Sequence, residues 1–259
     1  MGGIVGILLG GSRARSEHTP ESDYDLGLYY RPPLDVDALP ALARSLGDPA
    51  ANVTRPGEWG PWVDGGGWLH LSGSAVDWIY RDLDRVRASC EDAQAGRYIL
   101  HFQVGHPFGV PDFSYAGELA LGLVLADPSG DITALKEEFH GYPPRLGRPW
   151  WPDCGKRRSI STSPARRSAG RTRRYVAGCL FRVVELCAHA LHGHAGRWLV
   201  NEKGAVASAG RLPGAPVGFP ERAHGVLAHL GSTPSELNSA IDAARDLVAD
   251  TTTACGSPG

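Results

Sequence analysis

The sequence lacks several features that would indicate common classes of protein. Its 259 residues contain 26 Lys and Arg against 28 Asp and Glu, and the formal net charge of −2 gives no overall basic field to attract nucleic acid. The five cysteines are widely spaced and include no C-x-x-C pair, which argues against a disulfide framework or a zinc site and favours reduced thiols. The apolar run at residues 4–9 is too short to span a bilayer. We therefore expect a cytoplasmic protein with no membrane partner and no specific nucleic-acid partner, of unknown oligomeric state.

The patterning of the chain changes near residue 141. Before this point strands are predicted at 4–9, 23–30, 68–71, 75–80 and 98–104, a loop at 106–112, and helices at 83–95, 115–126 and 132–139. Beyond it the long periodic segments are helical only, at 175–192, 197–208, 220–230 and 234–248. We predict an α/β domain with a small mixed sheet over residues 1–141. An all-α helical bundle follows over residues 142–259, with a disordered tail at 251–259.

Three aspartates form the most informative pattern. Asp23 and Asp25 alternate on a predicted strand, and their side chains therefore project from one face about 7 Å apart. Two carboxylates on a rigid strand can share a hard cation such as Mg²⁺, which prefers oxygen ligands. Asp77 lies in the apolar strand 75–80, where a carboxylate is costly unless it is paired or binds a metal. If the two strands are neighbours, the three carboxylates converge on one site.

A glycine turn precedes the acid pair. Gly10, Gly11 and Ser12 end the first predicted strand. Glycine allows the backbone to approach a phosphate closely, and the exposed N–H groups and the Ser12 hydroxyl can bind its oxygens. Arg13 and Arg15 follow, and each is either a phosphate contact or a solvated turn residue. The turn and the carboxylates together describe a site for a metal-bound triphosphate.

These residues resemble the nucleotidyltransferase superfamily. Its signature is a Gly-Ser turn, a spacer, an acid-x-acid strand and a third acid on a later strand, which read here as GGSRARSEHTPESDYDLGLYY and AVDWIYRDL. Within the superfamily the chain is similar to the bacterial aminoglycoside and lincosamide nucleotidyltransferases and their uncharacterised relatives. The resemblance implies transfer of a nucleoside monophosphate, AMP first, from Mg²⁺-bound ATP or another NTP. The acceptor would be a hydroxyl of a small molecule such as an aminoglycoside-like antibiotic.

The resemblance also implies a role for each site residue. Asp23 and Asp25 would bind Mg²⁺, and Asp77 would be the general base or the third metal ligand. The expected nucleotide contacts are Gly11, Ser12, Arg15 and Lys203. The last of these lies in RWLVNEK, residues 197–203, which resembles the segment of the helical domain whose basic residue contacts the phosphates in the relatives.

Simpler interpretations of these residues remain open. Asp23 and Asp25 could be solvated acids on an edge strand, and Asp77 could form a buried salt bridge with Arg81 or Arg85. Lys203 could be an exposed lysine on a helix face. At the level of function, two alternatives are a protein-AMPylating, antitoxin-like enzyme and a degenerate non-catalytic member.

Two parts of the sequence depart from the family pattern. Ser16 occupies a position at which many relatives have glycine. Residues 147–174 are rich in Lys and Arg after Cys154 and have almost no apolar periodicity, where the resemblance leads us to expect an amphipathic helix. We interpret this segment as a disordered basic loop or as the product of two compensating frameshifts.

Overall fold

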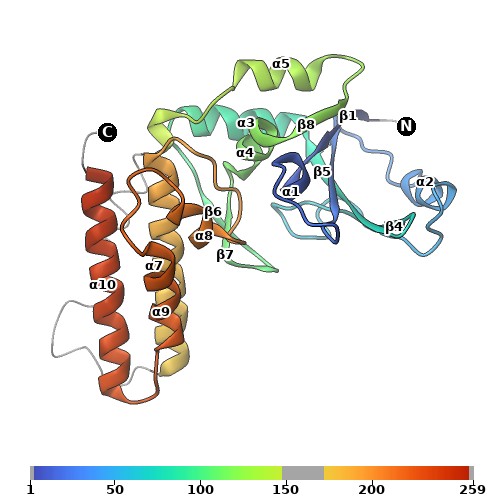
Figure 1. The fold of residues 1–259 in the computed structure, drawn as a ribbon. Helices are drawn as coiled ribbons and strands as arrows, with labels where there is room; N and C mark the ends of the chain where they lie inside the picture. Colours follow the sequence, from blue (N-terminus) through green and yellow to red (C-terminus); the bar gives the residue numbers. More distant parts are fainter. Residues whose placement is uncertain (1–2, 148–171, 257–259) are drawn as a thin grey trace. The chain divides into compact units, whose positions relative to one another are not determined.

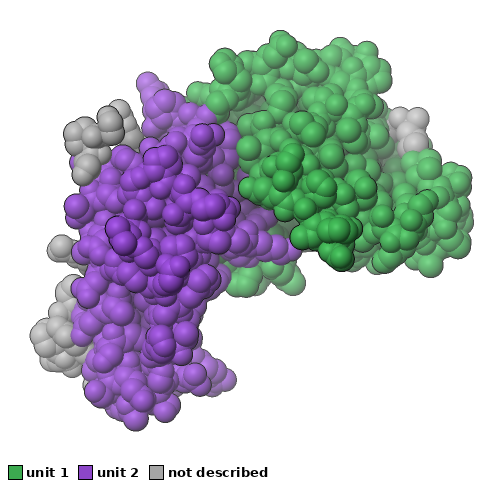
Figure 2. Space-filling model, viewed as in Figure 1, with its two compact units in different colours: residues 1–141 green, residues 142–259 purple. Residues whose placement is uncertain are grey.

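The computed structural model describes residues 3–147 and 172–256, and the chain divides into two compact units (Figures 1 and 2). The first unit, residues 1–141, combines strands with helices, and the second, residues 142–259, is helical in its described part. The predicted fold class, a mixed-sheet α/β part followed by a helical part, is confirmed. That each unit folds on its own as a domain stays a prediction.

The unusual segment 147–174 lies mostly outside the described residues, which exclude 148–171. Its interpretation as a loop or a frameshift is therefore untested. Its first residue, Gly147, and its last three are described. Thr172 caps helix α7 by accepting a hydrogen bond from the backbone N–H of Tyr175, and Arg173 and Arg174 begin that helix.

The first unit is built on a six-stranded sheet. Its strands are β1 (Ile4–Leu9), β2 (Tyr24–Tyr30), β3 (Asn52–Val53), β4 (Gly66–Leu71), β5 (Ser74–Asp82) and β8 (Leu123–Ala126). They lie in the order β3-β4-β5-β2-β1-β8, and the central strands β2 and β5 are parallel. A separate hairpin joins β6 (Leu100–Gln103) to β7 (His106–Pro111). The helices are α1 (Gly11–Ala14), α2 (Leu39–Ser45), α3 (Leu83–Gln94), α4 (Ser114–Leu121) and α5 (Asp131–Glu138).

The two faces of the sheet are covered by different helices. On one face, alternate residues of the central strands form a core with α2, made of Leu28, Tyr30, Leu39, Ala43, Leu69, Val76, Trp78 and Tyr80. On the other face lie Asp25 and Tyr29 of β2 with Asp77 and Arg81 of β5, since strand side chains alternate. Arg81 bonds Glu118 of α4, which places α4 over the Arg81 end of this second face. We call this second face the acid face.

Two predicted elements of the first unit are wrong. Residues 106–112 were expected to be a loop, but β7 pairs with β6 across Gly105, which has a φ of 85°. The helix predicted at 115–126 ends at Leu121, and residues 123–126 form β8 instead. Gly122 explains the break, because its backbone passes so close to β1 that an added Cβ would lie 2.3 Å from Leu8 Cδ2.

The second unit packs four described helices around one core. They are α7 (Arg173–His194), α8 (Ala205–Gly210), α9 (Phe219–Ala228) and α10 (Pro234–Gly256). Helix α7 buries Val176, Leu180, Val184 and Leu191, a helical spacing that faces the other helices. Among the described residues, α7 is the one helix long and apolar enough to cross a membrane. In this helix 61% of the apolar window is buried inside the protein. Buried core helices also meet the criteria of length and composition for a membrane span.

Two predictions for this unit are also wrong. The helix expected at 197–208 begins only at Ala205, after Gly204 with a left-handed φ of 73°. The tail expected to be disordered from residue 251 continues α10 as far as Gly256. Thr251 is fully buried, and its hydroxyl donates to the carbonyl oxygen of Leu247, which satisfies a polar group inside the helix.

Candidate active site

The structure brings the three predicted aspartates together. Asp25 and Asp77 are direct neighbours in the parallel register of β2 and β5, and Asp23 lies immediately before β2. One carboxylate oxygen of each residue lies within 4.8 Å of the others. Asp23 is exposed, whereas Asp25 and Asp77 are half-buried. Because β2 and β5 are central strands, the interpretation of Asp23 and Asp25 as acids of an edge strand is wrong.

Gly11 forms one wall of this carboxylate cluster. It has a left-handed φ of 60°, and a Cβ added to it would lie 1.7 Å from Asp25 Oδ2. The backbone N–H of Gly10 donates to the carbonyl oxygen of Asp25 at 2.7 Å. The glycine turn therefore packs directly against Asp25, and no side chain lies between them. The first turn of α1 leaves backbone N–H groups, including those of Gly11 and Ser12, without intrahelical acceptors.

Arg13 fixes the start of the acid strand. Its Nη2 donates to the carbonyl oxygen of Ser22 at 2.6 Å, and its Nε donates to that of Asp23 at 3.1 Å. Its guanidinium carbon lies 3.8 Å from the ring centroid of Tyr24. These contacts tie α1 to the residues just before β2. Arg13 therefore holds the acid strand against the glycine turn, a role that the sequence analysis did not identify.

The other two predicted nucleotide contacts, Arg15 and Lys203, lie outside the glycine turn. Arg15 lies at the end of α1, and its Nε donates to Glu17 Oε2 at 2.9 Å. Lys203 belongs to the second unit, where it is exposed on the turn before α8, and its backbone N–H donates to Asn201 Oδ1. It is therefore not on a helix, as the alternative interpretation had assumed. The phosphate contacts of Arg15 and Lys203 stay predictions. Ser16 has a φ of 58°, which explains why glycine suits this position.

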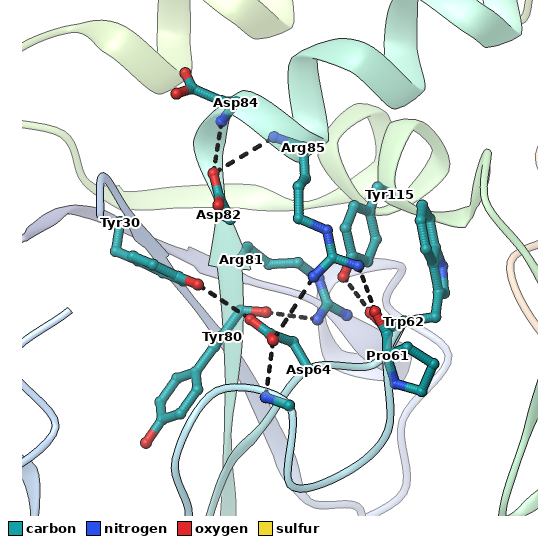
Figure 3. A network of polar contacts seen from close by, with 11 residues as sticks. Tyr30, Pro61, Trp62, Asp64, Tyr80, Arg81, Asp82, Asp84, Arg85 and Tyr115 are labelled. Atoms are coloured by element: carbon teal, nitrogen blue, oxygen red, sulfur yellow. Dashed lines mark hydrogen bonds and ion pairs between the residues drawn. The ribbon is translucent and has the colours of Figure 1, made fainter. Parts of the chain in front are cut away.

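The arginines of β5 and α3 have partners other than the three acids. Arg81 is buried, and its guanidinium forms two hydrogen bonds with Glu118, of 2.6 and 2.9 Å. Glu118 holds the pKa of Arg81 above its usual value against the opposing effect of burial. Arg85 forms its ion pair with the buried Asp64 at 3.6 Å (Figure 3). Arg81 and Arg85 thus form ion pairs with Glu118 and Asp64, and the role of Asp77 stays a prediction.

Asp64 organises the polar contacts around these arginines. It accepts hydrogen bonds from the Tyr30 hydroxyl at 3.1 Å and from the backbone N–H of Gly57 at 3.0 Å (Figure 3). Burial, followed by the charge of Asp64, raises the pKa of Tyr30 well above its usual value, so that its hydroxyl stays protonated and donates. These contacts lie near the C-terminal end of β5, where the backbone N–H of Tyr80 donates to the carbonyl oxygen of Gly65. They fix the loop at residues 57–64 to the sheet.

A pair of indole rings lies beside the carboxylate cluster. Trp68 of β4 is the direct register partner of Asp77, and its ring stacks on that of Trp59 with centroids 4.5 Å apart. Trp68 was not among the predicted site residues. The strands predicted at 68–71 and 75–80 leave a turn of three residues, which would set Trp68 opposite Trp78. The turn in the structure has two residues, Ser72 and Gly73, and this register sets Trp68 opposite Asp77.

The residues of this site fit a divalent cation. All three side chains offer carboxylate oxygens, the ligand type that Mg²⁺ and similar hard cations prefer. Because Gly11 has no Cβ, its backbone lies in direct contact with the Asp25 carboxylate, and N–H groups of such a turn can bind phosphate oxygens. Among the described residues this is the one cluster of acidic, histidine or cysteine groups close enough together to hold a metal ion.

Comparison with known proteins agrees with this arrangement. Residues 1–51, which include the glycine turn and the acid pair, match the family model described as nucleotidyltransferase domain. This N-terminal part of the chain carries a nucleotidyltransferase domain. The predicted superfamily and enzyme class are thereby confirmed. The chain is also similar to a solved structure, a nucleotidyltransferase-like protein from Exiguobacterium sibiricum 255-15. The alignment covers 98% of this chain and 71% of the other, with 13% sequence identity. Its TM-score is 0.37. No curated protein matches the chain.

Proposed function

We propose that this nucleotidyltransferase transfers a nucleoside monophosphate, AMP first, from a Mg²⁺-bound NTP to a hydroxyl of a small acceptor, with release of pyrophosphate. The observation that carries the proposal is the convergence of three carboxylates within 4.8 Å beside a glycine turn. A cytoplasmic location, where ATP is abundant, belongs to the same proposal.

Each residue of the cluster has a task in this reaction. Asp23 and Asp25 would hold the metal ion, with Asp77 as third ligand or as the group that accepts the proton of the acceptor hydroxyl. Bound Mg²⁺ would supply charge neutralisation at the phosphates. Backbone N–H groups of the Gly11–Ser12 turn would bind phosphate oxygens. Arg13 keeps the turn and the acid strand at a fixed separation, so that catalysis rests mainly on positioning.

The acceptor is part of the proposal. An aminoglycoside-like molecule is the first class to test, because the resemblance of the motifs is to enzymes that modify such antibiotics. An acidic cluster also attracts cationic molecules. Transfer to a protein hydroxyl, as in antitoxin-like members, is the alternative that an acceptor screen would distinguish.

Calorimetric titration of NTPs tests the nucleotide part of the proposal. Each NTP is titrated into the protein with and without Mg²⁺, alongside the variants Asp25→Asn and Glu91→Gln. The second variant is a matched control, since Glu91 is an exposed acid on α3 and its substitution changes the net charge by the same amount. We expect Mg²⁺-dependent binding that Asp25→Asn loses and Glu91→Gln keeps. Absence of binding by folded wild-type protein would refute the proposal and favour a degenerate, non-catalytic member.

A further inference from the structure

The indole pair, Trp59 and Trp68, lies on the acid face of the sheet. Residues directly opposite each other on neighbouring strands project from the same face, with Cβ atoms about 5 Å apart. Trp68 is opposite Asp77, and Asp77 is opposite Asp25, so the three side chains form a row across β4, β5 and β2. The neighbours of Trp68 and Asp77 along their strands, Leu69 and Val76, point to the opposite face and are buried there.

Trp68 stacks on a neighbouring ring and is nevertheless open to solvent. Its side chain is 51% exposed, although the strand that carries it is paired on both sides, with β3 and β5. Trp59 supports its ring by stacking at an interplanar angle of 23°. Trp59 in turn packs against Gly66 of β4, where an added Cβ would lie 2.8 Å from Trp59 Cζ3. A large apolar ring fixed in this way offers a preformed surface for a ligand.

The order of the strands places this surface on the acceptor side of the cluster. The glycine turn follows β1, the acids lie on β2 and β5, and Trp68 lies on β4, in the sheet order β4-β5-β2-β1. In phosphoryl transfer the attacking and leaving oxygens lie roughly in line on opposite sides of phosphorus. If the leaving pyrophosphate occupies the glycine turn, the attacking hydroxyl approaches from the side of β5 and β4.

We propose that Trp68, supported by Trp59, binds the acceptor by packing against one face of its ring. This inference rests on the proposed function and extends it to the acceptor. An indole face suits a saturated, hydroxylated ring with an apolar face, such as a sugar or cyclitol. It also attracts a protonated amine carried by such a ring, through the negative face of the indole. A serine or threonine hydroxyl of a protein offers no ring to this surface.

The proposal is tested with two substitutions of Trp68 and one matched control. Trp68→Ala removes the surface, and Trp68→Phe keeps an aromatic face. Phe102→Ala removes an exposed aromatic ring, 87% exposed, from β6 of the same unit. Thermal unfolding of each variant checks that it is folded. Binding of an ATP analogue with a non-cleavable α,β-methylene bridge is measured first with Mg²⁺, and kanamycin, an amine-bearing ring acceptor, is then titrated into that complex.

We expect all variants to bind the ATP analogue with wild-type affinity. Trp68→Ala should bind kanamycin at least tenfold more weakly, while Trp68→Phe and Phe102→Ala should stay within threefold of wild type. Kanamycin binding that Trp68→Ala leaves unchanged would overturn the inference, as would a wild-type complex that binds no kanamycin. Failure of the wild-type protein to bind the ATP analogue would instead refute the proposed function. The two failures are therefore distinguishable.

Discussion

Substitution of Gly11 by alanine should weaken metal binding at least about a hundredfold, at a cost of about 1–2 kcal/mol in stability. The added Cβ would lie 1.7 Å from Asp25 Oδ2, whereas ordinary contact begins at 3.4 Å. The carboxylate must therefore move by about 1.7 Å, far more than the ~0.2 Å within which metal–ligand distances are normally held. The left-handed φ of 60° adds a backbone cost of about 1–2 kcal/mol for alanine. The protein should thus remain folded while the carboxylate cluster is disrupted.

Titration with Mn²⁺, followed by electron paramagnetic resonance of the free ion, measures this effect without any substrate. The matched control is Gly10→Ala, because Gly10 has an extended φ of −107° and an added Cβ would make an ordinary 3.7 Å contact with Asp25. We expect Gly10→Ala to bind Mn²⁺ like the wild type and Gly11→Ala to bind it at least about a hundredfold more weakly. Equal Mn²⁺ affinity in the two variants would show that Asp25 is not a metal ligand, and the geometric reasoning would fail.

Three further predictions concern stability. Ser16→Gly should raise the free energy of unfolding by about 1 kcal/mol, or a few degrees in Tm, because it relieves the left-handed φ of 58°; an unchanged Tm would contradict this. Glu118→Leu should cost about 3–5 kcal/mol in urea unfolding because it leaves the buried charge of Arg81 unpaired. Arg81→Met should cost less, since Glu118 is 35% exposed and can be hydrated; the reverse order would refute the argument. Burial, followed by the charge of Glu202, raises the pKa of Glu185 to about 7, so the native state keeps a proton that the unfolded state loses near pH 4.5. Stability should therefore fall as pH rises between these values. Glu185→Gln should remove that fall and be up to about 3 kcal/mol more stable than the wild type at pH 8, but not at pH 4.5, as measured by urea unfolding at both pH values.

The elements that surround the site could be predicted from the sequence because their signals are local. Strands β1 and β2 are short apolar runs bounded by Gly10 and by Pro32, and the hairpin of β4 and β5 has a two-residue turn containing Gly73. The acid pair needs only strand alternation to place Asp23 and Asp25 on one face. The fold class follows from the change of pattern near residue 141.

The parts that could not be predicted depend on contacts between distant segments. The run at 115–126 is apolar throughout and reads as one helix, and only the close approach of Gly122 to Leu8 shows why it divides into α4 and β8. Nothing near Arg81 in the sequence indicates that its partner is Glu118, on a different element. The sequence does not show that β2 pairs with β5 in parallel, and this pairing brings Asp77 beside Asp25.

The parallel pairing of β2 and β5 also has a consequence for how the chain folds. The two strands are separated by α2, β3 and β4, so their pairing closes a long loop, and contacts of high sequence separation tend to form slowly. Until that step is complete, Asp77 is absent from the cluster and the reactive constellation does not exist. A nascent chain that has synthesised β2 but not yet β5 therefore contains Asp23 and Asp25 without the complete carboxylate cluster. Mn²⁺ uptake during refolding would report the moment at which the sheet closes.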